Sequence, residues 1–262
     1  MLSWRAKRQL IIASIPVLLI LGLGFLFFQR FLPEPTCFDN KKNQGELGVD
    51  CGGPCGPCEL KNPKSVEIFW ARAVLARPQM YDVAAEVRNS NEVLYSAGME
   101  YEFTLFDEFG LIARKVGRTF ILPQERTHVI EANLNTTREP SRVEFKILNI
   151  DWQFKKLEQP NLVIERRDYK IIEIDGKKQS LVEASVLNKT PFNFREIVVN
   201  FAVLDAEGNL LGANRVLVES LLAGSRQTVK SIWPQELKGR ATTIIVEPRV
   251  NFFDPTIIIK PR

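Results

Sequence analysis

The chain has 262 residues, of which 45% are hydrophobic and 25% charged, and its formal net charge is +4. These fractions are typical of globular proteins and argue against disorder over the whole length. Basic and acidic residues alternate, with no lysine or arginine run longer than two residues. This dispersed charge argues against a nucleic-acid partner.

The first element is an apolar segment near the N-terminus. Residues 10–28 (LIIASIPVLLILGLGFLFF) contain no charge. At about 1.5 Å per helical residue, the segment is just long enough to cross a hydrocarbon core of about 30 Å. Arg5, Lys7 and Arg8 precede it, which favours a cytoplasmic N-terminus over residues 1–9. The segment therefore predicts a single-pass protein of the cell membrane, with lipid as one partner and the bulk of the chain extracytoplasmic.

The segment has two alternative interpretations, a cleaved signal peptide and a buried core helix. A cleaved signal peptide has an apolar core of about 7–15 residues and a small-residue cleavage site, whereas this segment is longer and ends in Phe25–Phe28. A buried core helix would show a polar stripe, which is missing. We favour the uncleaved anchor, although a signal peptide would also place residues 31–262 outside the cytoplasm.

Residues 33–60 form a cysteine-rich module that contains all four cysteines, Cys37, Cys51, Cys55 and Cys58. So short and glycine-rich a segment cannot build an apolar core, so covalent bonds or a metal must hold it together. Disulfides are favoured in an exported protein, and three pairings are open. Because a Cys-x-x-Cys ring is strained, we expect Cys55 and Cys58 to pair outward. Zinc is the alternative, but its ligands usually come as two close pairs, and Cys37 stands alone.

Oxygen ligands occur in the same module. Asp39, Asn43, Glu46 and Asp50 are spaced by four, three and four residues. Calcium takes six to eight oxygens from such groups, so the four residues are candidate calcium ligands, and calcium is the one cofactor that the sequence suggests. The alternative is that Asp, Asn and Gly are simply turn formers here.

The module also resembles a short motif of many bacterial and archaeal surface proteins, with the form C-x-D-x3-N-x2-E-x3-DCGG-x-C-x2-C. Every fixed position of that form is matched between Cys37 and Cys58. The resemblance implies a surface context and no defined activity.

Residues 61–153 and 160–253 look like two copies of one domain. The clearest landmarks are Val83–Asn89 against Val182–Asn188, and the offset between the copies stays near 98–101 residues. A repeat of this period indicates duplicated domains. Lys155–Pro160 is the expected linker, and residues 254–262 are a C-terminal tail that either adds a strand or frays.

Each copy has the pattern of a β-sandwich. Glu100–Phe106 alternates polar and apolar residues, and Asp-x-x-Gly turns follow Phe103–Asp107 and Phe201–Asp205. Several short strands in about ninety residues, without a long helical pattern, are typical of such a fold. The predicted fold class is mainly β, with one N-terminal transmembrane helix, a small cysteine-stapled module and two tandem immunoglobulin-like β-sandwiches.

At these strands the repeat resembles the FxLYD-type family of immunoglobulin-like domains. The family's tyrosine is replaced by Phe106 and Leu204, and its Leu-x-Pro-Gly turn is only partly kept. The resemblance implies an extracellular or envelope sandwich without a catalytic site. The positions that carry the family motif are Phe103, Leu105, Asp107, Gly110, Phe201, Val203, Asp205 and Gly208.

The sequence offers little catalytic chemistry. Its one histidine, His128, lies in a predicted strand, where we expect it to be half-exposed. No nucleophile elbow, P-loop or zinc-protease motif occurs, so we predict a protein that is not an enzyme.

The predicted function is that of a non-enzymatic, membrane-anchored envelope or surface protein. It would display two β-sandwiches for structural, adhesive or partner-docking roles, with a protein or cell-wall partner outside the cell. The alternative is an accessory subunit of an envelope transport or secretion assembly, in which Gly22 and Gly24 pack against a partner helix.

Overall fold

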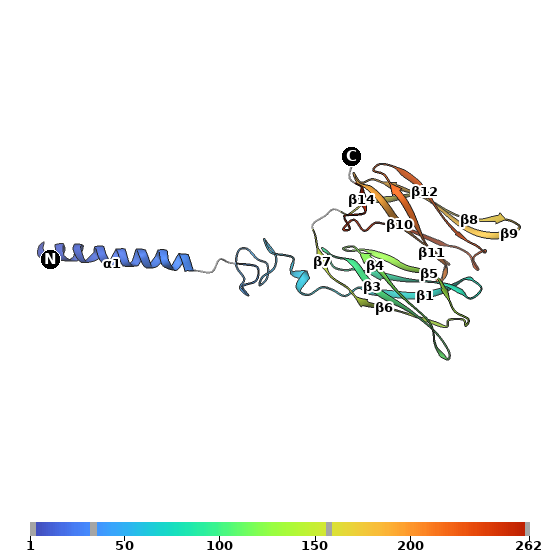
Figure 1. Ribbon diagram of the computed structural model, residues 1–262, viewed down its shortest axis with the longest axis horizontal. Helices are drawn as coiled ribbons and strands as arrows, with labels where there is room; N and C mark the ends of the chain where they lie inside the picture. Colours follow the sequence, from blue (N-terminus) through green and yellow to red (C-terminus); the bar gives the residue numbers. More distant parts are fainter. Residues whose placement is uncertain (1–3, 32–35, 156–158, 260–262) are drawn as a thin grey trace. The chain divides into compact units, whose positions relative to one another are not determined.

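The structure is a computed structural model that describes residues 4–31, 36–155 and 159–259. It is mainly β, with one α-helix, α1 (Trp4–Phe31), and a short 3-10 helix, η1 (Cys58–Lys61), in the described part of the chain (Figure 1). The chain divides into two compact units, residues 1–58 and residues 59–262. The first contains α1 and most of the cysteine module, and the second contains all the strands.

The prediction of a transmembrane helix over residues 10–28 is corrected by the structure. Among the described residues, no helix combines the length and the apolar character needed to cross a membrane. The fold class is therefore corrected in its transmembrane helix while its mainly β character stands, and the predicted single-pass location in the cell membrane with a cytoplasmic N-terminus is not supported.

The first half of the larger unit contains seven strands within the described residues. They are β1 (Glu67–Arg77), β2 (Met80–Arg88), β3 (Leu94–Asp107), β4 (Gly110–Ile121), β5 (Arg126–Asn135), β6 (Arg142–Asn149) and β7 (Gln153–Phe154). One sheet has the order β1-β2-β5, and the other has the order β4-β3-β6 with β7 paired to β3.

The second half repeats this arrangement. Its described strands are β8 (Leu162–Ile174), β9 (Lys177–Asn188), β10 (Asn193–Leu204), β11 (Leu210–Leu221), β12 (Arg226–Trp233), β13 (Thr243–Arg249) and β14 (Ile258–Ile259). The sheets have the orders β8-β9-β12 and β11-β10-β13, with β14 paired to β10. Each strand of the first half therefore has a counterpart in the same position of the second half, and β14 is the strand formed by the tail. The expected linker includes residues 156–158, which lie outside the described residues.

Corresponding strands of the two halves pair in the same register. Phe103 in β3 faces Phe145 in β6, and its counterpart Phe201 in β10 faces Val246 in β13. All four side chains are buried in the apolar core between the two sheets of their own half. Each half thus has its own core, as a β-sandwich requires.

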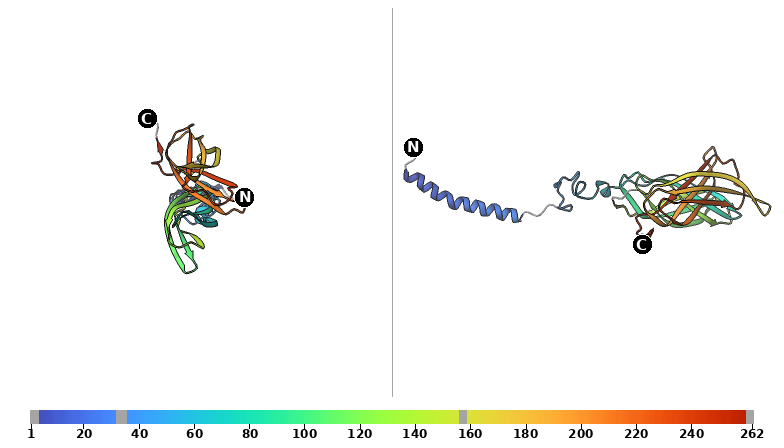
Figure 2. Two further views of the ribbon diagram at one scale, coloured as in Figure 1. Left: turned by 90° about the vertical axis from the view of Figure 1, so that its right-hand side faces the viewer. Right: turned by 90° about the horizontal axis from the view of Figure 1, so that it is seen from above.

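The two sandwiches also pack against each other, sheet on sheet. Alternate residues of β2 point to opposite faces, so Val83 and Ala85 enter the first core while Ala84 lies in a separate apolar cluster with Ala202 and Ala213 of the second sandwich. This cluster joins the sheet β1-β2-β5 to the sheet β11-β10-β13, and Figures 1 and 2 show the two sandwiches side by side. Small alanine side chains allow the two sheets to approach closely.

Candidate functional site

The cysteine module contains two disulfides. Cys37 is bonded to Cys55, and Cys51 is bonded to Cys58. Both cysteines of the Cys-x-x-Cys pair therefore bond outside that pair. Gly48 packs on one of these bonds, because a Cβ there would lie only 2.8 Å from Cys51 Sγ.

The four candidate calcium ligands lie together in the module. The carboxylate oxygens of Asp39, Glu46 and Asp50 accept hydrogen bonds from the chain itself, whereas Asn43 Oδ1 has no hydrogen-bond partner among the described residues. Asp50 accepts from the backbone N–H of Asp39 and of Asn40 at 3.0 Å. Glu46 Oε2 accepts from the backbone N–H of Asp50 at 3.0 Å and of Asn43 at 3.3 Å. Carboxylates thus satisfy the backbone donors of a loop that has no sheet or helix to do so.

Asp39 completes this set of acceptors. Its oxygens accept from the Asn43 side-chain amide at 2.7 Å and from the Lys41 backbone N–H at 2.9 Å. The hydrogen bond from Asn43 is the main reason that the pKa of Asp39 is lowered.

One group in the module has the proximity of a metal site. Ligand atoms of Cys37, Glu46 and Cys55 lie within 4.8 Å of one another. Both sulfurs belong to one disulfide, so neither is available as the thiolate that a metal would bind. The group is therefore a disulfide with a carboxylate beside it.

The residues of the family motif form cores and turns. Phe103, Leu105, Phe201 and Val203 are fully buried. In the turns, Asp107 accepts from the Phe109 N–H at 2.9 Å, and Asp205 accepts from the Asn209 N–H at 2.6 Å. Gly110 and Gly208 have φ angles of 128° and 80°, which favour glycine. The motif thus encodes the sandwich and its hairpins.

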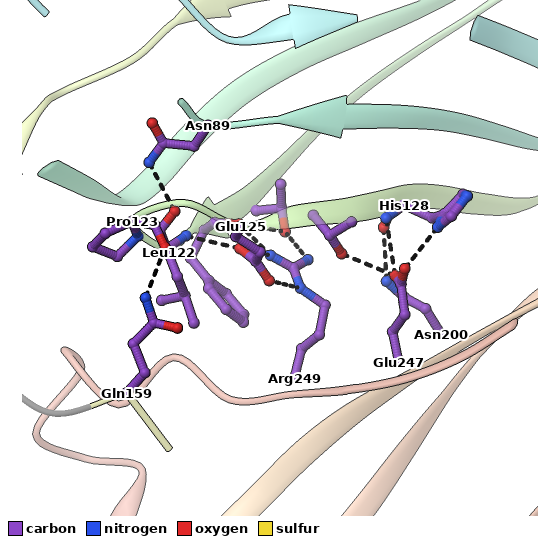
Figure 3. A network of polar contacts seen from close by, with 12 residues as sticks. Asn89, Leu122, Pro123, Glu125, His128, Gln159, Asn200, Glu247 and Arg249 are labelled. Atoms are coloured by element: carbon purple, nitrogen blue, oxygen red, sulfur yellow. Dashed lines mark hydrogen bonds and ion pairs between the residues drawn. The ribbon is translucent and has the colours of Figure 1, made fainter. Parts of the chain in front are cut away.

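The polar residues that converge lie elsewhere, at the interface between the sandwiches (Figure 3). Glu247 in β13 accepts from Thr127 Oγ1 and from the His128 N–H, both at 2.9 Å, and its Oε1 lies 2.8 Å from His128 Nδ1. Asn200 in β10 donates to the His128 carbonyl at 2.7 Å. One carboxylate and one amide of the second sandwich thus bind the free edge of β5.

Burial and hydrogen bonding act in opposite directions on Glu247. Burial raises the pKa of this carboxyl, but the hydrogen bond and charge of His128, together with the charge of Arg249, outweigh it and lower the pKa. His128 itself is 4% exposed, so the expectation of a half-exposed histidine was wrong. The strand that carries it is covered by the second sandwich.

A second ion pair joins the sandwiches beside the first. Arg249 binds Glu125 through both carboxylate oxygens, at 2.8 and 3.0 Å, and donates to the Phe120 carbonyl at 2.8 Å. Its guanidinium lies 4.3 Å from the centre of the Phe120 ring. The Arg249 side chain is only 6% exposed, so this is a buried, bidentate pair with its other donors largely satisfied.

Next to these pairs is a cavity of about 220 Å³ at the interface. His128, Asn200 and Arg249 line it, together with Arg118 of β4 and Arg215 of β11. The residues around this cavity include arginines, carboxylates and asparagine amides.

The sequence pattern did not predict this interface. Charged residues at alternating strand positions are typical of a solvent-exposed face, and Glu247 and Arg249 occupy such positions. The available signal was a difference between the copies. By strand register, His128 corresponds to Thr228 and Glu247 to Lys146, so the interface residues lie where the copies diverge.

Comparisons with known proteins assign no family. No protein-family model matches the chain, and no curated protein matches it in sequence. Among solved structures, one match is the tandem CBM22-1–CBM22-2 domain of Xyn10C from Paenibacillus barcinonensis. It shares 9% identity over 66% of this chain and 82% of that one, with a TM-score of 0.14, too low to carry an argument. The resemblance to FxLYD-type domains stays a prediction.

Proposed function

We propose that the chain is a non-enzymatic binding protein of an oxidising, extracytoplasmic compartment, in which two β-sandwiches act as one rigid unit that docks a partner. The observation that carries this proposal is the sheet-on-sheet interface with its two buried ion pairs. A protein that only needed two independent modules would not require Glu247 and Arg249 to be buried against the first sandwich.

The compartment is inferred from the cysteines. Disulfides persist in oxidising environments, and both pairs of cysteines in this chain are bonded. We propose further that the module folds without calcium, because the oxygens of Asp39, Glu46 and Asp50 are already engaged by donors of the module. Their role would be that of backbone acceptors.

Partner capture in intact cells tests the proposal. The full chain with a C-terminal tag is crosslinked, purified and compared with the Arg249→Ala variant and with the control Arg166→Ala, which lies on a solvated strand and is exposed. We expect the wild type and the control to recover the same discrete partner, and the Arg249→Ala variant to lose it. Equal recovery with all three proteins would contradict a role for the rigid unit, and recovery of the chain alone would contradict docking.

The composition of the recovered material separates the two predicted roles. A partner recovered in fixed ratio as part of a multi-subunit complex would favour the accessory-subunit alternative. Wall polymer or material from neighbouring cells would favour an adhesive or structural role.

A further inference from the structure

We propose that the cavity between the sandwiches binds a small carboxylate that also carries hydrogen-bond donors, such as an amino acid or a hydroxy acid. The cavity volume of about 220 Å³ suits a ligand of that size. This inference does not depend on the proposed function, since it concerns a small molecule and its test rests on Arg118 and Arg215, which carry no part of that function.

The first argument is the presence of unpaired cations. Arg249 is neutralised by Glu125, but Arg118 and Arg215 form no ion pair or side-chain hydrogen bond with any part of the chain that the structure describes. Both arginines line the same cavity. A guanidinium presents its N–H donors in one plane, in a geometry that matches the two oxygens of a carboxylate. Two unpaired arginines at one cavity therefore favour an anionic ligand there.

The second argument concerns the surroundings of these arginines. A Cβ on Gly98 would lie 2.2 Å from Arg118 Nη2, so the guanidinium lies directly against the backbone of Gly98. Arg215 lies near the buried hydroxyl of Tyr101. Burial raises the pKa of that hydroxyl, as does its hydrogen bond to Glu131, while the charges of Arg215 and Arg249 oppose the rise.

The third argument concerns the polar atoms that the protein leaves without a partner. His128 Nε2 and Asn251 Oδ1 are buried, and neither forms a hydrogen bond with the described residues. Both residues line the cavity. Because His128 Nδ1 lies 2.8 Å from Glu247 Oε1, Nδ1 carries an N–H there, and Nε2 accepts in the neutral ring and donates in the charged ring. Asn251 Oδ1 is an acceptor in either case, so the ligand must bring a donor.

The charge of the cavity supports the same ligand. Glu196 and Asp254 also line it and would repel a bare anion such as phosphate. An amino acid offers a carboxylate to the arginines and an ammonium group to the acceptors. A hydroxy acid offers hydroxyl donors instead, so the shared requirement is an anion with donors.

Thermal unfolding of the full chain tests the proposal with three probes, L-glutamate, glutarate and inorganic phosphate. Glutarate lacks only the ammonium group of glutamate, and phosphate tests simple anion binding. We expect glutamate at about ten times its Kd to raise Tm by about 3 °C. Glutarate and phosphate should raise it by less than half as much at the same concentration and ionic strength.

Variants of the free arginines identify the site. In Arg118→Gln/Arg215→Gln, the Tm without ligand should be unchanged, because both side chains are exposed and unpaired among the described residues, and the rise with glutamate should disappear. The control Arg166→Gln should keep the rise. No response to glutamate, an equal response to glutarate or phosphate, or a response that survives in the double variant would each overturn the proposal.

Discussion

Single asparagines organise one end of each sandwich. Asn89 is fully buried and donates to the carbonyls of Leu94 and Leu122, at 2.8 and 2.7 Å. Asn188 in the second copy is buried in the same way and donates to the carbonyls of Phe192 and Leu222. Each amide thus satisfies carbonyls at or directly beside the ends of two strands, β3 and β4 in the first copy and β10 and β11 in the second, which gives a physical reason for the repeated asparagine.

These asparagines yield a stability prediction. Asn188→Asp preserves shape but removes both N–H donors and leaves buried carbonyls unsatisfied, so we expect a loss of about 2–3 kcal/mol in the free energy of unfolding. Urea unfolding followed by tryptophan fluorescence measures it. The exposed Asn161→Asp is the control and should change stability by less than about 0.5 kcal/mol. Equal effects of the two substitutions would contradict the role given to Asn188.

For Asp82 we predict that a substitution increases the free energy of unfolding. Burial raises its pKa to about 6, against the hydrogen bond from the Asn133 N–H at 2.9 Å. Because the pKa is raised in the folded state, ionised Asp82 destabilises the fold at neutral pH. This destabilisation decreases as pH falls through about 6 and is gone below the pKa of an aspartate in the unfolded chain.

The corresponding variant is Asp82→Asn, whose amide oxygen can still accept from Asn133. We expect it to be more stable than the wild type by about 2 kcal/mol at pH 8, with a difference that vanishes below about pH 4. Denaturant unfolding at a series of pH values measures the difference. A variant that is less stable at pH 8 would show that Asp82 is not strained by burial.

At the scale of elements, strands β2 and β10 are covered on both faces. Val83, Ala84 and Ala85 are all buried, as are Phe201, Ala202 and Val203. Strands of a free-standing sandwich alternate between core and solvent, whereas strands between two layers read as continuous apolar runs. In β2 and β10 these runs lie where the sandwiches meet.

The interface carboxylate gives a pH prediction. Because the folded-state pKa of Glu247 is lowered, its contribution is present above the unfolded value of about 4.3 and is lost as pH falls through the folded pKa. We expect Glu247→Gln to cost about 2 kcal/mol at pH 7 and to flatten the loss of stability in acid. Parallel acid titrations of wild type and variant would contradict this assignment.

The cysteine module gives a further prediction at this scale. Glu46 is buried and accepts from the backbone at two points, so Glu46→Ala should open the module and expose it to limited proteolysis, with or without EDTA. Gln at this position keeps an acceptor and should be cut more slowly. If EDTA alone opened the wild-type module, a bound metal would have to support it.

How much of this could be read from the sequence depends on how local each signal is. The buried asparagines and the Asp-x-x-Gly turns are local, repeat in both copies and led to the strands around them. The interface could not be predicted because Glu247 and His128 are far apart in the sequence and look like ordinary solvated positions. The apolar N-terminal segment was interpreted from hydropathy alone, and the spanning helix inferred from it does not stand.

At the scale of the whole molecule, the two copies use different sheets to contact each other. The first copy uses the outer face of β1-β2-β5, and the second uses the outer face of β11-β10-β13. A head-to-tail contact continues from molecule to molecule when both faces remain available. In the second copy, Arg166 and Ser185 occupy the positions of Trp70 and Glu86. The face that corresponds to the interface of the first copy is therefore charged and solvated, which disfavours a further contact of the same kind.

The central claim is that the two sandwiches behave as one unit, and scanning calorimetry tests it most directly. For residues 59–262 we expect one transition whose calorimetric and van't Hoff enthalpies agree. Arg249→Ala, which leaves Glu125 buried without its partner, should lower the Tm and split the transition in two. Two transitions in the wild type, or a variant that unfolds as the wild type does, would contradict the account.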